Sequence, residues 1–326
     1  MNKLFLFTLL SISYSFGQSF HPAPGNAGTN AIKRDSSCFI GWATGGSVQR
    51  GYVDISDTTV TYNGTNKADY GNIQAACGPA TGSVTDIVSL GDSGIVIMTF
   101  DHFIMDGPGY DFAVFENGFT DGYMELAHVE VSSDGINYFR FPSTSEIPLS
   151  TQLGNASISD CRYVNNLAGK YRVGFGTPFD IAEIPNDPNL DKQAIRYVKL
   201  IDVVGTITGP YASVDSNGGI INDPFPTPFG SCGFDLEAIG IIQGYLKIDE
   251  NEFQSVQLFP NPASTNITIK TDERISFEVY SSDGKLLTKQ HNIQEYTIDL
   301  SGYEVGIYTI KLHSSNATSV KKFVKN

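Results

Sequence analysis

The strongest constraint on the fold is a series of short runs rich in branched and aromatic residues, each bounded by turn-forming residues. Turn signals such as Asp106-Gly107-Pro108-Gly109 and Asn217-Gly218-Gly219 separate these runs. We find no segment with three turns of helical periodicity. Strands without intervening helices predict an all-β fold with an antiparallel sandwich or barrel. The runs are Gly94–Phe100, Asp111–Phe115, Ala127–Ser132, Tyr138–Phe141, Tyr197–Val203 and Phe234–Ile242.

The clearest of these units is His128–Phe141. Val129 and Val131 lie on one face of a strand by period-2 counting. The dipeptide Asp134-Gly135 follows and favours a tight hairpin turn. This segment therefore predicts two antiparallel strands.

The composition of the chain changes near residue 243. Its 326 residues are long enough for two domains. Residues 18–246 hold 25 acidic and 11 basic residues and so carry a formal charge of −14, whereas residues 247–326 are almost neutral. We predict a jelly-roll-like β-sandwich binding domain over residues 18–243, a linker at 244–252 and a small domain at 253–326. The acidity argues against nucleic acid and anionic membranes as partners, because both would repel the protein.

The first residues have the features of a signal peptide. Lys3 supplies a positive charge, and Leu4–Ile12 form an apolar run too short to span a bilayer. Ser15-Phe16-Gly17 places small residues where a signal peptidase reads the chain, so we predict cleavage after Gly17. No other stretch is long and apolar enough for a transmembrane segment. We expect an exported protein.

The C-terminal domain has a pattern of seven short strands, which predicts a small immunoglobulin-like β-sandwich. Its distinctive motifs are Leu258-Phe259-Pro260-Asn261-Pro262, Asp283-Gly284-Lys285, Leu300-Ser301, Gly306-Ile307-Tyr308 and the basic end Lys321–Lys325. In these motifs the domain closely resembles the C-terminal sorting domain of type IX secretion system cargo in Bacteroidota. This resemblance implies that residues 253–326 engage the type IX machinery and that the protein is secreted or held on the outer cell surface.

The acidic segment resembles a group of uncharacterised bacterial cell-surface proteins. The resemblance rests on Gly107–Phe119, Val129–Gly135, Leu167–Lys170, Gly174–Asp180 and Gly233–Ile239. It implies a strand order similar to galactose-binding-like jelly rolls, but no activity. Some relatives are associated with nutrient uptake, including uptake of cobalamin.

Four carboxylates are candidates for binding Ca²⁺, which prefers oxygen ligands. Glu116 shares a strand face with Phe112 and Val114, so it is expected to point inward, where a carboxylate needs a partner. Asp235 and Glu237 share a face, opposite Phe234, Leu236 and Ala238. With Asp111, they predict one or more Ca²⁺ sites that hold loops to the sandwich. The alternative is an exposed polar face with Asp111 in a turn.

Aromatic residues on loops are candidates for stacking on a sugar or another flat ring. From a wider set that includes Tyr52, Tyr70, Phe225 and Phe229, we select five as ligand-binding residues. The alternative for each ring is a place in the core. The five are Trp42, Tyr110, Phe119, Tyr123 and Tyr211.

The cysteines and the catalytic motifs leave the mechanism open. Cys38, Cys77, Cys161 and Cys232 allow three disulfide pairings in an oxidising compartment, or none. We find no nucleophile elbow, phosphate-binding loop or dinucleotide fingerprint. Carboxylates such as Asp101 and Asp106 leave a glycosidase pair as an alternative.

We therefore predict a non-catalytic binding protein for a glycan or a scavenged small molecule such as a cobalamin, with Ca²⁺ as structural support. The alternative is a secreted hydrolase acting on polysaccharide or peptide. Catalysis predicts two acids with shifted pKa values in a deep cleft, whereas binding predicts a shallow groove of aromatic residues without such a pair.

Overall fold

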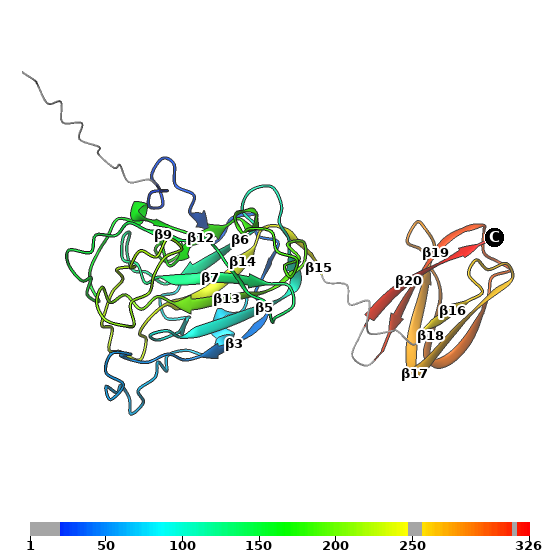
Figure 1. Ribbon diagram of the computed structural model, residues 1–326. Coiled ribbons are helices and arrows are strands. Elements are labelled where there is room, and N and C mark those ends of the chain that lie inside the picture. The colour runs from blue at the N-terminus through cyan, green and yellow to red at the C-terminus, as the bar shows by residue number, and fades with distance from the viewer. Residues whose placement is uncertain (1–19, 247–255, 315–317) are drawn as a thin grey trace, which may run out of the picture. The chain divides into compact units, whose positions relative to one another are not determined.

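The computed structural model describes residues 20–246, 256–314 and 318–326, so the predicted signal peptide lies outside the described residues. The chain forms two compact units, Met1–Leu246 and Lys247–Asn326. Both are built of antiparallel strands (Figure 1). Within the described residues the only helical segments are three single 3₁₀ turns, which agrees with the all-β prediction. They are η1 (Ile73–Ala76), η2 (Cys161–Tyr163) and η3 (Ile181–Glu183).

The large unit is a sandwich of two antiparallel sheets. The order in the first sheet is β1-β12-β6-β14-β2, with β4 also pairing with β14. Its strands are β1 (Ile32–Lys33), β2 (Gly41–Trp42), β4 (Val88–Ser89), β6 (Phe112–Glu116), β12 (Phe175–Phe179) and β14 (Asp235–Ile241).

The order in the second sheet is β11-β7-β13-β5-β15, with β3 also pairing with β5 and β8 with β7. Its central strands β7, β13 and β5 lie side by side in Figure 1. The strands are β3 (Gly45–Gln49), β5 (Ile95–Ile104), β7 (Ala127–Ser132), β8 (Phe139–Arg140), β11 (Leu167–Ala168), β13 (Ile195–Asp202) and β15 (Gly244–Leu246). A separate pair joins β9 (Thr144–Ser145) to β10 (Val164–Asn165).

The chain crosses between the two sheets at every step of the series β5, β6, β7, β12, β13 and β14. This alternation is a property of jelly rolls and confirms the predicted class of sandwich. One boundary differs from the prediction. Gly244–Leu246, expected to begin a linker, pair with β5 as strand β15, while residues 247–252 lie outside the described residues.

The predicted hairpin is present, with Glu130 opposite Arg140 and Val131 opposite Phe139. Its turn is longer than the tight turn we expected. The Asp134 carboxylate accepts hydrogen bonds from the backbone nitrogens of Ile136 and Asn137, both at 2.8 Å. These bonds hold the pKa of Asp134 well below its usual value.

The main core lies between the two sheets, and the outer face of the first sheet is covered as well. Phe112 and Val114 on β6 belong to the main core. Ala113 and Phe115, on the other face of β6, pack with Trp42 in a smaller cluster. Both faces of β6 are therefore covered, and all five of its residues are buried.

The small unit has one five-stranded sheet rather than seven short strands. The sequence pattern predicts separate strands at 266–270 and 275–280, but both are parts of the one strand Asn266–Tyr280. The strands that it predicts at 286–289 and 296–300 likewise fall on one strand, which runs from Leu286 to Asp299. Register shifts interrupt the pairing of these two long strands between Lys270 and Ile275. The strands are β16 (Gln257–Phe259), β17 (Asn266–Tyr280), β18 (Leu286–Asp299), β19 (Gly306–His313) and β20 (Thr318–Lys325), and they surround a separate core that includes Phe277 and Phe323.

Candidate functional site

Four buried carboxylates gather at one end of the large sandwich, and we call them the acid cluster: Glu116, Glu125, Asp223 and Asp235. The strand register explains their meeting. Glu116 ends β6 beside the start of β14, where Leu236 is its register partner. Glu125 precedes β7, and Asp223 comes from the long loop 205–231. Each side chain is at most 8% exposed.

Glu116, Asp223 and Asp235 each accept one hydrogen bond. The backbone nitrogen of Gly118 donates to Glu116 Oε2 at 2.8 Å, and that of Leu126 donates to Asp223 Oδ2 at 3.1 Å. Asn117 Nδ2 donates to Asp235 Oδ2 at 3.1 Å. The second oxygens, Glu116 Oε1 and Asp223 Oδ1, have no hydrogen-bond partner among the described residues.

Glu125 differs from the other three. Its side chain is 8% exposed, yet its carboxylate has no hydrogen bond and no ion pair within the part of the chain that the structure describes. Burial raises the pKa of Glu125 well above its usual value, and the charges of Asp235, Glu116 and Asp223 raise it further. An unpaired buried carboxylate is costly for the fold, so its retention needs an explanation.

Burial also raises the pKa of Asp235, to about 7. Ser89, its register partner on β4, lowers the pKa of Asp235 in part. Neither Ser89 Oγ nor Asp235 Oδ1 has a hydrogen-bond partner among the described residues. Arg50 also lowers the pKa of Asp235. The guanidinium of Arg50, however, donates to the backbone carbonyls of Tyr70, Gly71 and Ser89 rather than to a carboxylate.

A cavity of about 360 Å³ opens beside the acid cluster. Glu125 and Asp235 line it together with the Asn117 amide. Four aromatic rings complete much of the wall, and the ring centroids of Phe119 and Tyr123 are 5.5 Å apart. Asn155, from the segment before η2, and Thr227 and Ser231, from the long loop 205–231, also line the cavity. The aromatic residues are Tyr70, Phe119, Tyr123 and Phe229.

The structure therefore brings together four of the nine residues selected from the sequence: Phe119, Tyr123, Glu116 and Asp235. Phe119, Tyr123 and Asp235 line the cavity, and Glu116 lies behind it, inward-facing as expected. Glu125, Asp223 and Asn117 were missed. The sequence does contain a signal for Glu125, because this acid stands between Met124 and Leu126 in an otherwise apolar run that leads into β7.

The other three aromatic candidates lie elsewhere. Trp42 packs against Phe39 and Phe115, with ring centroids 4.7 and 5.6 Å away, so it covers the outer face of the first sheet. The hydroxyl of Tyr110 accepts a hydrogen bond from Asn30 Nδ2 at 2.9 Å, beside a pocket of only about 50 Å³. Tyr211 is exposed on a loop.

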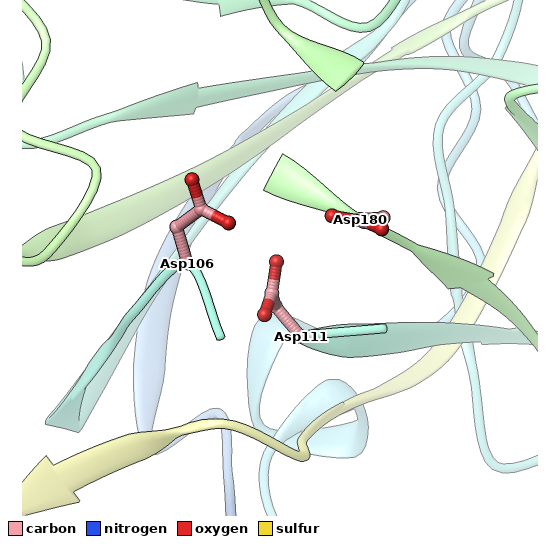
Figure 2. Close-up of side chains that lie close together, drawn as sticks. All are labelled: Asp106, Asp111 and Asp180. Carbon is pink, nitrogen blue, oxygen red and sulfur yellow. The ribbon is translucent and has the colours of Figure 1, made fainter. Parts of the chain in front are cut away.

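Asp111 belongs to a second group of acids, the Asp106–Asp111–Asp180 trio. Figure 2 shows the three carboxylates turned toward one shared space. Each offers an oxygen within 4.8 Å of the others. Asp111 itself accepts hydrogen bonds from the backbone nitrogens of Gly107 and Ile181, at 2.9 and 2.7 Å. Burial raises its pKa to about 6, and the charges of Asp180 and Asp106 contribute to the rise.

Glu237 lies apart from both groups. Its Oε1 accepts hydrogen bonds from the backbone nitrogen of Gly82 at 2.5 Å and from Thr81 Oγ1 at 3.2 Å. The expectation that Ala238 shares a face with Leu236 is wrong. A register shift between these two residues turns Ala238 to the outer cluster, while Leu236 stays in the main core. The four predicted metal ligands therefore occupy three separate places.

A larger groove of about 560 Å³ lies along loop 147–177. Its acids are already paired at the surface, because Asp121 and Asp160 form salt bridges with Arg172 and Arg162 at 3.0 and 2.6 Å. It lacks a buried carboxylate of the kind that Glu125 provides. None of the four cysteines, all within the described residues, forms a disulfide.

Residues 257–326 match the family described as the secretion system C-terminal sorting domain. The small unit is a type IX sorting domain. The protein is accordingly a type IX cargo that is secreted or held on the outer surface, and its sorting domain interacts with the type IX machinery. Among the described residues, no helix has the length and hydropathy needed to cross a membrane.

The solved structures with similar folds are distant. The BSP domain of a biofilm-associated protein has 10% identity and a TM-score of 0.20, over 71% of this chain and 48% of that one. The CBM51-2 and INT domains of Clostridium perfringens ZmpB have 9% identity and a TM-score of 0.19, over 91% and 83%. A Ruminococcus gnavus β-glucuronidase has 10% identity and a TM-score of 0.17, over 71% and 34%.

At these scores the likenesses carry no argument about function. The chain spans about half of the biofilm-associated chain and about a third of the glucuronidase chain. No curated protein matches the sequence.

Proposed function

We propose that the large β-sandwich is a binding module that takes up a ring-bearing ligand, a glycan unit or a small molecule of similar size, in the cavity beside the acid cluster. The observation that carries this proposal is the unpartnered carboxylate of Glu125 in the wall of a cavity lined by four aromatic residues. The ligand would be met outside the cell, since the sorting domain directs the protein there.

The composition of the wall suits such a ligand. Aromatic faces stack on sugar rings or other flat groups, and a few buried polar groups then fix the orientation. Ligand hydroxyl or amine groups would donate to Glu125 and Asp235. A volume of about 360 Å³ accommodates one or two sugar rings. A ligand as large as a cobalamin would enter only in part.

The test is a glycan array followed by titration of the best ligand, with a cobalamin titration in parallel. We expect Phe119→Ala and Tyr123→Ala each to weaken binding about tenfold or more, because each removes a stacking surface. Tyr211→Ala is the matched control, since Tyr211 is an exposed loop aromatic outside the cavity. Equal affinity of all three variants and the wild type would place the ligand elsewhere.

One observation favours a hydrolase as the second candidate. Glu125 and Asp235 line the same cavity, and burial raises the pKa of each, as it does for the general acid of a glycosidase. Incubating the bound glycan with the protein and measuring new reducing ends distinguishes the two functions. If reducing ends are released over time and Glu125→Gln abolishes this release, the function is catalysis rather than binding.

We also propose that Ca²⁺ supports the fold at the Asp106–Asp111–Asp180 trio. Three carboxylate oxygens within 4.8 Å of one another fit the spacing of ligands around one such ion. A bound cation would also offset the repulsion that raises the pKa of Asp111. This trio differs from the ligand set expected from the sequence, which shares only Asp111 with it.

A further inference from the structure

The acid cluster has an unbalanced charge. The charges of Asp235 and Asp223 raise the pKa of both Glu116 and Glu125, which burial already raises. Arg50 is the cation that lowers the pKa of Asp235, and its donors are used by backbone carbonyls. Buried anions without a counter-charge are strongly disfavoured, so a positively charged ligand group would stabilise the carboxylates in the cavity wall.

A single metal ion is a poor match for this wall. Ligand oxygens around one Ca²⁺ lie within about 5 Å of one another, because each is about 2.4 Å from the ion. Among the described residues that spacing is met by Asp106, Asp111 and Asp180, and by no trio drawn from the acid cluster. Only Glu125 and Asp235 of the cluster line the cavity, and no three of its carboxylates gather around one point.

The aromatic residues favour an organic cation instead. Tyr70, Phe119, Tyr123 and Phe229 line the same cavity as Glu125. A ring face attracts a cation, and a desolvated site strengthens that attraction. A carboxylate accepts a charge-assisted hydrogen bond from an ammonium group, which is stronger than a bond from a hydroxyl. One protonated amine can make both contacts.

We propose that the cavity selects ligands that carry a protonated amine, as an amino sugar or another ring-bearing amine does, with Glu125 as the primary acceptor of its N–H groups. This inference rests on the proposed binding function and names its ligand class. Asp235 lines the same wall and adds a second acceptor. The aromatic residues hold the ring to which the amine is attached.

Matched ligand pairs test the selectivity on the full chain. The first pair is the β-1,4-linked glucosamine trisaccharide and cellotriose, and the second is benzylamine and benzyl alcohol. The first pair tests an amino sugar as the source of the amine, and the second an aromatic amine. Ligand-observed NMR titration measures all four. We expect the amine of at least one pair to bind about tenfold tighter than its neutral partner.

Glu125→Gln keeps the size of the side chain and removes its charge. We expect it to weaken binding of the amine in the responding pair much more than binding of its neutral partner, which brings their affinity ratio close to one. Glu237→Gln is the control, because Glu237 is a buried carboxylate outside the cavity, and it should keep the wild-type ratio. Circular dichroism checks the fold, and Asp235→Asn replaces Glu125→Gln if that variant does not fold.

The outcomes separate the two proposals. Neutral ligands that bind as well as the amines, with a dependence on Phe119, would overturn amine selectivity and leave the binding function intact. An amine preference that Glu125→Gln does not change would also overturn it. If neither pair binds, amine selectivity is wrong, and the binding function is then judged by the glycan array.

Discussion

At the scale of single residues, Glu125 has an environment that a glutamate rarely occupies. The residue is 8% exposed, the charges of three other acids of the cluster act on its carboxylate, and it has no donor among the described residues. Removing a charged group from water without a partner costs several kcal/mol, which proteins usually avoid by protonation or pairing. Burial and the neighbouring acids therefore favour the protonated form of Glu125, and a positively charged ligand group would favour the ionised form.

The raised carboxyl pKa values predict that stability falls as the pH rises. Unfolded carboxyls lose their protons near pH 4, whereas folded Asp235 and Asp92 keep theirs up to about 7. Between these values the folded state binds more protons, so the free energy of unfolding decreases with increasing pH. We expect a loss of roughly 1–3 kcal/mol from pH 6 to pH 8, measured by urea unfolding.

One other group opposes this decrease in stability, and one variant tests its cause. His128 acts in the opposite direction, because burial lowers its pKa to about 4, so its contribution is lost as the pH falls below about 6.5. Between pH 6 and pH 8 His128 therefore offsets part of the decrease, by less than about 1 kcal/mol. Asp235→Asn should make the decrease smaller. A midpoint that is equal or higher at pH 8 in the wild-type protein would contradict the prediction.

At the scale of elements, the ends of strands decide where the chemistry lies. β6 ends at Glu116, and the antiparallel β14 begins at Asp235, so the two acids meet across neighbouring strands. The register shift after Leu236 then separates Asp235 from Glu237, although only one residue lies between them. Strict alternation predicts one shared face, and a β-bulge breaks that alternation. Side-chain period alone does not reveal such a shift.

The segments that contain Asp106 and Asp180 are where we expect Ca²⁺ to bind. We expect Ca²⁺ to raise the melting temperature of the protein by about 3 °C or more relative to a chelator, because it would bind the folded state only. Asp106→Asn should remove most of this increase by deleting one ligand charge. Differential scanning calorimetry measures both proteins.

Asp101→Asn is the control for this experiment, because Asp101 is an exposed acid on β5 that bonds Thr44 and lies outside the trio. It should keep the full calcium effect. An identical melting temperature of the wild type with Ca²⁺ and with chelator would remove calcium from the proposal.

At the scale of the whole molecule, the two units have separate tasks. The sorting domain occupies the matched residues 257–326 and has its own core, and the residues that line the cavity belong to the large unit. Deleting residues 257–326 should therefore retain the protein inside the cell envelope of a host with type IX machinery, while the β-sandwich keeps its ligand affinity. Immunoblots of medium and cell fractions measure the export.

The full chain expressed in the same host is the reference, and Tyr211→Ala controls for a change outside both the sorting domain and the cavity. We expect Tyr211→Ala to be exported like the wild type. Equal export of the truncated and full chains would show that another segment directs secretion.

The sequence by itself determined the class of fold, the positions of six strands of the large unit and the destination. These depend on local information: the alternation within Ala127–Ser132, the turn residues between strands, and the compact motifs of the sorting domain. The strand 127–132 agrees with the structure at both ends. The inward direction of Glu116 followed from the same alternation.

Only the tertiary structure decided which of the candidate residues meet. Glu125 and Asp223 are separated by almost a hundred residues, and the crossing of strands between two sheets brings them together. The same packing placed Trp42 against Phe115 and left Tyr211 exposed. Contacts between distant segments depend on strand register and on bulges, and these depend on all the strands of the sheet. The composition of one segment therefore does not predict such contacts.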